Sequence, residues 1–180
     1  MMYGLARVPR EGETFSGDNF TYSEEAPGQV IMSISDGMGS GEQAFEESRR
    51  VVELAQQLLE TGFSARSALK MVNTVLILTG KEQHPATMDL CCVDLHTGVL
   101  EVMKLGAAAT FVLNGNGVEV LEAGEVPAGV LKTVEPVLLS RKLWDGDRVI
   151  LVTDGVLEAC PGEDKEGSLR EYIEGMEVHS

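Results

Sequence analysis

The chain has 180 residues, of which 43% are hydrophobic and 24% are charged. This mixture favours one folded domain over residues 1–180 rather than a disordered segment. Its formal net charge of −15 repels nucleic-acid phosphates and anionic membrane surfaces, so neither is an expected partner. The same charge suits divalent cations, although a soluble acidic surface is the simpler explanation.

The first half of the chain predicts one strand followed by two helices. A short apolar strand over 29–35 ends at Asp36, and a glycine-rich turn follows. Apolar residues then recur at helical spacing over 42–60, and Gly62 is expected to end this helix because glycine tolerates left-handed geometry. A second amphipathic helix is expected over 65–78.

The second half predicts antiparallel strands. Apolar and β-branched runs indicate strands over 88–94, 99–105, 109–113, 118–121, 137–143 and 148–153. Tight turns such as Asn114-Gly115-Asn116-Gly117 join them, which makes successive strands antiparallel. A short helix is expected over 168–174. Because the helices cluster in the middle and do not alternate with strands, we expect an α+β layered fold.

The three cysteines, Cys91, Cys92 and Cys160, form no Cys-x-x-Cys pair. A zinc knuckle or a redox pair is therefore disfavoured, and a reducing cytoplasm fits. No run approaches the roughly 18 apolar residues of a membrane span, so we expect a cytoplasmic chain without a membrane segment.

Three aspartates stand beside a glycine where a strand is expected to end or turn: Gly17-Asp18-Asn19, Asp36-Gly37 and Asp154-Gly155. Mg²⁺ and Mn²⁺ prefer oxygen ligands, and glycine lets a backbone carbonyl approach an ion beside the carboxylate. Two such ions about 3.5–4 Å apart can activate water for attack on phosphorus. An isolated Asp-Gly pair is more often a β-turn. A generic acidic domain with these three carboxylates far apart therefore stays open.

Six runs of the sequence carry a resemblance to a known family: SGDNF (16–20), ISDGMGSGEQAFEES (34–48), ATMDLCCVDLHTG (86–98), KLGAAATFV (104–112), VPAGVL (126–131) and GDRVILVTDGVLEA (146–159). In this order they resemble the phosphatase domain of stage II sporulation protein E. That domain is one of the PPM (type 2C) metal-dependent serine/threonine phosphatases. SDGMGSG, followed by a helix and then T-x-D, is fairly specific to this bacterial branch.

The resemblance implies a four-layer αββα sandwich, in which two stacked antiparallel sheets are flanked by helices. It implies that a phosphoserine or phosphothreonine on a regulatory protein, such as an anti-sigma factor antagonist, is hydrolysed by metal-activated water. Two Mn²⁺ or Mg²⁺ ions would be the cofactors. The two central helices match a pair that acts as a regulatory switch beside the metal site, and a homodimer through these switch helices is expected.

The resemblance also assigns residues. Asp18, Asp36 and Asp154 match the catalytic metal aspartates, with Asp36 bridging the two ions. Gly37 would offer its carbonyl to a metal, and Asp89 matches an acidic position associated with an extra metal in some members. Apart from the resemblance, Arg7 lies upstream of the first motif and could contact phosphate, although an isolated arginine is more often a surface residue.

One family motif is missing. The family ends with D-D-[MA]-T or D-N on a final strand, and the aspartate of this motif ligates a metal. Asp164 is the last aspartate of this sequence and lies in a charged stretch instead. We therefore expect a domain that is incomplete at its C-terminal end and lacks the last strand. Two functions stay open: an active phosphatase, and a non-catalytic pseudophosphatase that binds a partner without full metal binding.

Overall fold

A computed structural model of the chain describes residues 1–9, 12, 14–24, 27–39, 41–79, 85–122 and 126–176. The elements are β1 (Asp18–Ser23), β2 (Gln29–Asp36), α1 (Gly41–Glu60), α2 (Ala65–Thr79), β3 (Met88–Asp94), β4 (Val99–Leu105), β5 (Thr110–Asn114), β6 (Gly117–Leu121), β7 (Val137–Lys142), β8 (Arg148–Leu151), α3 (Asp154–Ala159) and α4 (Lys165–Met176). Among the described helices, none combines the length and the apolar character needed to cross a bilayer.

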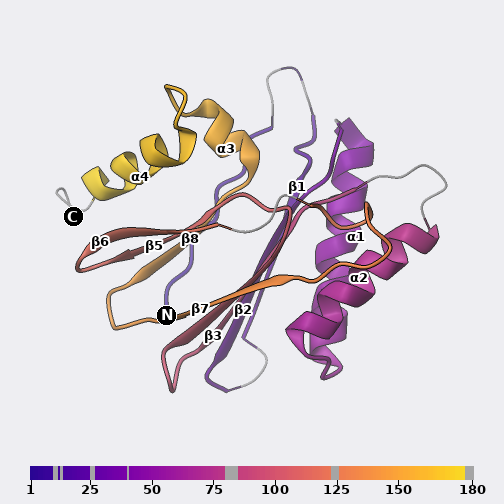
Figure 1. Ribbon diagram of the computed structural model, residues 1–180, viewed down its shortest axis with the longest axis horizontal. Coiled ribbons are helices and arrows are strands. Elements are labelled where there is room, and N and C mark those ends of the chain that lie inside the picture. Colours follow the sequence, from indigo (N-terminus) through magenta and orange to yellow (C-terminus); the bar gives the residue numbers. More distant parts are fainter. Residues whose placement is uncertain are drawn as a thin grey trace.

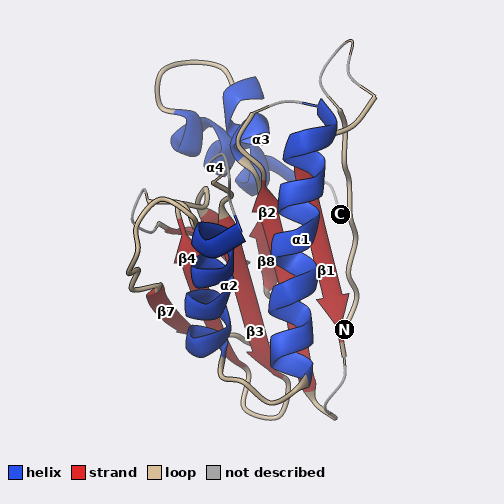
Figure 2. Ribbon diagram, turned by 90° about the vertical axis from the view of Figure 1, so that its right-hand side faces the viewer, coloured by secondary structure: helices blue, strands red, loops and turns tan. Residues whose placement is uncertain are grey.

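The strands form two antiparallel sheets, a larger one in the order β1-β2-β3-β4-β7 and a smaller one in the order β6-β5-β8. Figure 1 shows α1 and α2 on the outer side of the larger sheet, and α3 and α4 on the side of the smaller sheet. In Figure 2 the helices α1 and α2 lie side by side across the larger sheet. The predicted α+β fold of two stacked antiparallel sheets flanked by helices is thus confirmed.

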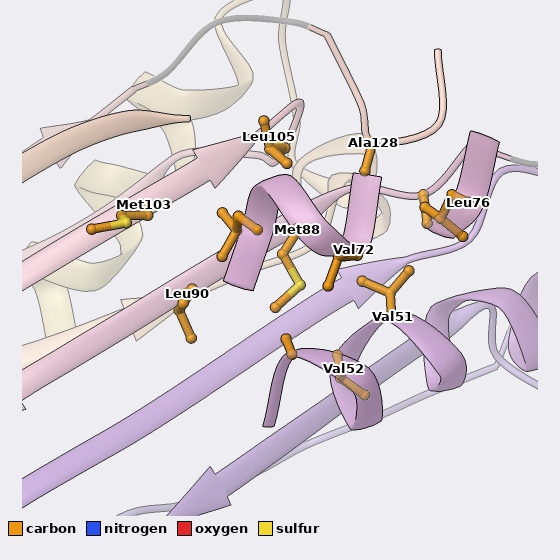
Figure 3. Packing of buried hydrophobic residues seen from close by; sticks show 12 residues of the cluster. Val51, Val52, Val72, Leu76, Met88, Leu90, Met103, Leu105 and Ala128 are labelled. Carbon is orange, nitrogen blue, oxygen red and sulfur yellow. The ribbon is translucent and has the colours of Figure 1, made fainter. Parts of the chain in front are cut away.

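Three apolar clusters hold the four layers together. The first lies between the larger sheet and its helices, where Val52 of α1 and Val72 of α2 pack with Met88 of β3 (Figure 3). The second joins the two sheets and includes Val102 of β4 and Val112 of β5. The third lies between the smaller sheet and α4. Each large apolar side chain that is fully buried contributes about 1.5–3 kcal/mol.

The sequence of the central strand β3 reflects the apolar clusters that cover both of its faces. Leu90 belongs to the cluster under the helices, whereas its neighbour Cys91 belongs to the cluster between the sheets. Successive residues of a strand point to opposite faces, so a strand covered on both faces is a continuous apolar run rather than an alternating one. This explains why MDLCCVD lacks a polar face.

Strand β1 has no counterpart in the predicted elements. Its sequence, DNFTYS, is mostly polar, and its residues are mostly half-buried. Hydrogen bonding to β2, from Asp18 opposite Asp36 to Ser23 opposite Ile31, makes this segment a strand. Tertiary pairing therefore decided the conformation where the local pattern did not.

The prediction of a strand over 148–153 that ends in an Asp-Gly turn was wrong at its end. The strand stops at Leu151, and Asp154 begins helix α3. Thr153 occupies the N-cap position with an extended backbone, φ −93° and ψ 167°. A negative charge in the first turn suits the helix dipole, so Asp154 is favoured there.

Helix α4 begins earlier than residue 168, where the sequence pattern placed its start. Asp164 precedes it and accepts a hydrogen bond from the amide of Gly167 at 2.8 Å, while the amide of Ser168 donates to the Asp164 carbonyl at 3.0 Å. Asp164 is therefore a helix cap rather than a loop residue.

Candidate active site

Asp18 and Asp36 lie directly opposite each other on β1 and β2. Residues paired across two strands project to the same face of the sheet, so both carboxylates belong to one face. Ser16 fixes one of them, because its hydroxyl donates to Asp18 Oδ2 at 2.9 Å. The Asp18 amide in turn donates to Ser16 Oγ at 3.3 Å.

Asp36 stands where β2 ends, and Thr87 holds its backbone in place. The Asp36 amide donates to Thr87 Oγ1 at 2.9 Å, and the Thr87 amide donates to the Asp36 carbonyl at 2.8 Å. Ser35 Oγ adds a bond to the Thr87 carbonyl at 2.6 Å. The end of β2 is thus clamped to the chain that enters β3.

Two glycines beside these aspartates allow close backbone packing. A Cβ at Gly37 would lie 2.7 Å from the carbonyl carbon of Ala44, in the first turns of α1, which is closer than a real Cβ atom approaches. A Cβ at Gly17 would lie 3.1 Å from Asp36 Oδ1. The amide of Gly37 donates to the Gly17 carbonyl at 3.2 Å, so the two motifs are also joined directly.

A cavity of ≈ 990 Å³ gathers the predicted site residues other than Asp89. It is lined by Asp18, Asp36 and Gly37 from the larger sheet, by Asp154 at the start of α3, and by Arg7. The N-terminal segment that carries Arg7 passes α3 on its way to β1 (Figure 1). Arg7 Nη1 donates to the Asp18 carbonyl at 3.2 Å, and its guanidinium lies 5.6 Å from the Phe45 ring centroid.

The donor atoms of this cavity suit a hard divalent cation. Carboxylates and a nearby backbone carbonyl are oxygen ligands of the kind that Mg²⁺ and Mn²⁺ prefer, and the described lining residues include neither histidine nor cysteine. The missing side chain of Gly17 leaves room beside the carboxylate of Asp36. Across the described part of the chain, no three His, Cys, Asp or Glu side chains already converge as a metal cluster.

Asp89 is not among the residues that line this cavity, although its cross-strand partner Ile34 is. Asp89 is fully buried and forms an ion pair with Lys104, which is its partner across β3 and β4. Thr110 of β5 donates to Asp89 Oδ2 at 2.5 Å, and Lys104 Nζ also donates to the Ala108 carbonyl at 2.6 Å. Burial raises the pKa of Asp89, and the Lys104 ammonium opposes that rise. The role of Asp89 toward an extra metal stays a prediction.

Neither Ser16 nor Thr87 was predicted as a site residue from the sequence, although both hold a predicted site residue. The role of Ser16 was predictable in principle, because a serine two residues before an aspartate can form a local side-chain hydrogen bond. Thr87 acts across strands, at a distance in sequence that no local pattern encodes. Both residues nevertheless fall within the runs that carry the family resemblance.

Comparison with known proteins decides the family. The model of the family "Stage II sporulation protein E (SpoIIE)" matches residues 26–179. The chain belongs to the SpoIIE family. It is 32% identical over 155 residues to stage II sporulation protein E of Priestia megaterium and 30% identical to that of Bacillus subtilis. These alignments cover 86% of this chain but 26% and 19% of the relatives, so the chain spans about a quarter of their length or less.

Solved structures agree with this family. The PP2C phosphatase domain of SpoIIE from Bacillus subtilis, solved with a fragment of its regulatory domain, superposes with a TM-score of 0.86 at 28% identity. That match covers 94% of this chain and 50% of the solved one. RsbX in complex with magnesium has the same fold, with a TM-score of 0.73 at 17% identity over 96% of this chain and 84% of that one. The fold is that of PP2C-type serine phosphatases.

Proposed function

We propose that this chain is a metal-dependent protein serine/threonine phosphatase domain. The observation that carries the proposal is the meeting of Asp18 and Asp36, paired across β1 and β2, with Asp154 in one cavity. Asp18, Asp36, Asp154 and the Gly37 carbonyl would hold two Mn²⁺ or Mg²⁺ ions. Such ions supply Lewis-acid charge and activate water for attack on a phosphate ester.

The residues around the cavity have complementary tasks in this proposal. Arg7 presents a guanidinium fork, which binds phosphate oxygens in a bidentate manner. Ser16 and Thr87 orient Asp18 and Asp36 through the bonds described above. Carboxylates alone would repel a phosphate group, so the site needs cations between them and the substrate.

A phosphopeptide assay tests this function. Phosphate release from phosphoserine and phosphothreonine peptides is expected to require Mn²⁺ or Mg²⁺ and to stop with EDTA. Asp36→Asn should lower kcat/KM by about 10²–10³-fold, the scale of losing one group that stabilises transition-state charge. Asp145→Asn is the matched control, because Asp145 also precedes a glycine but lies in the exposed turn between β7 and β8, outside the cavity.

Two results would count against an active phosphatase. One is the absence of metal-dependent release by the wild type, and the other is an unchanged kcat/KM in Asp36→Asn. If the wild type binds a regulatory partner but neither binds Mn²⁺ nor releases phosphate, the pseudophosphatase alternative is favoured.

We further propose that the substrate is a phosphorylated regulatory protein, such as an anti-sigma factor antagonist, in the cytoplasm. SpoIIE membership supports a regulator of this kind, and the three free cysteines fit a reducing compartment. A homodimer through α1 and α2 is also proposed. It is supported by apolar side chains on the surface of α2, where Leu78 is 78% exposed. Light scattering of wild type and Leu78→Glu at matched concentrations tests the dimer, which the charge should weaken.

A further inference from the structure

Asn19 follows Asp18 on β1, but its side chain lies on the other face of the sheet, where it bonds to helix α1. Its Nδ2 donates to the Phe45 carbonyl and to Ser48 Oγ, both at 3.0 Å, and both partners belong to α1. Asn19 is 8% exposed and Ser48 is 0% exposed. Successive strand residues point to opposite faces. One residue of β1 therefore supplies a carboxylate to the cavity, and the next attaches the strand to the helix.

Ser48 extends this attachment to the residue before Asp18. Its hydroxyl accepts the bond from Asn19 and has the Gly17 carbonyl within hydrogen-bonding reach, besides two carbonyls of its own helix. A hydroxyl has one proton to donate, and among these acceptors the Gly17 carbonyl is the one outside α1. The same carbonyl accepts the Gly37 amide at 3.2 Å. A single carbonyl thus joins the helix to both aspartate motifs.

We infer that Asn19 and Ser48 are positioning residues that hold the Asp18 carboxylate opposite Asp36 by fixing the Gly17-Asp18 backbone against α1. The buried network contains Asn19 of β1 and Ser48 of α1. It ends on the backbone carbonyl of Gly17, the residue before Asp18. A shift of α1 would therefore move Gly17 and, with it, Asp18. The inference deepens the proposed function and rests on it for the assignment of Asp18 as a metal ligand.

The test compares Mn²⁺ affinity among three single variants. Ser48→Ala and Asn19→Ala should each weaken Mn²⁺ binding, measured by calorimetry without substrate, by about 10–100-fold, the usual effect of losing a group that orients a metal ligand. Alanine is a better helix former than serine, so Ser48→Ala should not impair α1 itself. Ser33→Ala is the matched control. It removes a hydroxyl of the same strand pair, bonded at 2.6 Å to Thr21 but to neither aspartate motif.

The double variant and the kinetics distinguish positioning from simple stabilisation. Asn19→Ala with Ser48→Ala should weaken Mn²⁺ binding little more than either alone, because both act through one network. The KM for a phosphopeptide at saturating Mn²⁺ should stay within about twofold, and kcat should recover with added Mn²⁺. A Ser48→Ala affinity within twofold of wild type, or an equal loss in Ser33→Ala, would overturn the inference. A wild type that binds Mn²⁺ but hydrolyses nothing would refute the proposed activity, and the affinities would still decide the positioning role.

Discussion

The buried pair Asp89–Lys104 offers the sharpest test of how this fold is held together. Both side chains are 0% exposed, and Thr110 brings β5 of the smaller sheet into contact with this pair from the larger sheet. Lys104→Met keeps nearly the same volume and removes the charge. The Asp89 carboxylate would then be buried without its cation, while Thr110 remains its sole described hydrogen-bond donor.

The expected loss is large. Removing one member of a buried ion pair costs about 3–5 kcal/mol, out of a total stability of about 5–15 kcal/mol for a domain of this kind. Asp89 Oδ1 already lacks a described hydrogen-bond partner, so no second bond compensates for the loss. In contrast, Asp89→Leu combined with Lys104→Met leaves no buried charge, and such a replacement is often neutral or stabilising.

Urea denaturation in EDTA, followed by circular dichroism, measures both free energies of unfolding. EDTA excludes any contribution from bound metal, and an unchanged m-value shows that the denatured state is comparable. The double variant should be more stable than Lys104→Met by at least about 2 kcal/mol, within the range measured for coupled neighbours. A loss below about 1 kcal/mol in Lys104→Met, or a double variant no more stable than the single one, would refute the reasoning.

The loss should also depend on pH. Burial raises the pKa of Asp89, and Lys104→Met removes the cation that opposes this rise. A carboxyl with a raised folded pKa binds more protons when native, so the free energy of unfolding falls as pH rises from the unfolded pKa through the folded one. Lys104→Met should therefore lose less stability near pH 4 than near pH 7. An equal loss at both pH values would contradict this account.

Two further predictions concern single contacts. Gly37→Ala should lower the free energy of unfolding by about 1–3 kcal/mol through overpacking, because its Cβ would meet the Ala44 carbonyl. Gly175→Ala, with no atom within 4 Å of the new Cβ in α4, should be neutral or stabilising by up to about 1 kcal/mol, and equal losses would contradict the packing argument. In an alkaline absorbance titration, Tyr22 should resist ionisation until about pH 12, because its hydroxyl donates to Glu24 and this raises its pKa to about 12. That interaction stabilises the fold below pH 10 and is lost through about pH 12. Glu24→Gln should move the titration toward pH 10, and an unchanged curve would exclude the contact.

The sequence predicted best where periodicity and turn chemistry agree. The helix over 42–60 and the stop at Gly62, which has a φ of 91°, follow from apolar spacing and the tolerance of glycine for left-handed backbone. Strand β1 was missed because its polar residues form a strand only beside β2. The helix at Asp154 was missed because the preceding apolar run gives no sign of where its pairing stops.

Local sequence patterns do not encode how the three aspartates of the site lie relative to one another. Asp18 and Asp36 come together through the pairing of two neighbouring strands, a relation that register can set. Asp154 follows β8 of the other sheet and begins a helix of the opposite outer layer. Its placement relative to the first two aspartates therefore depends on how the two sheets stack. That stacking is fixed by the apolar cluster between the sheets and by the pair of Asp89 and Lys104 with Thr110. Asp89 and Lys104 pair within the larger sheet, whereas Thr110 belongs to the smaller one. Misaligned sheets would therefore leave the buried Asp89 carboxylate without the Thr110 donor, which is costly for a buried charge. The pair thus favours the one sheet arrangement that brings all three aspartates to the same cavity.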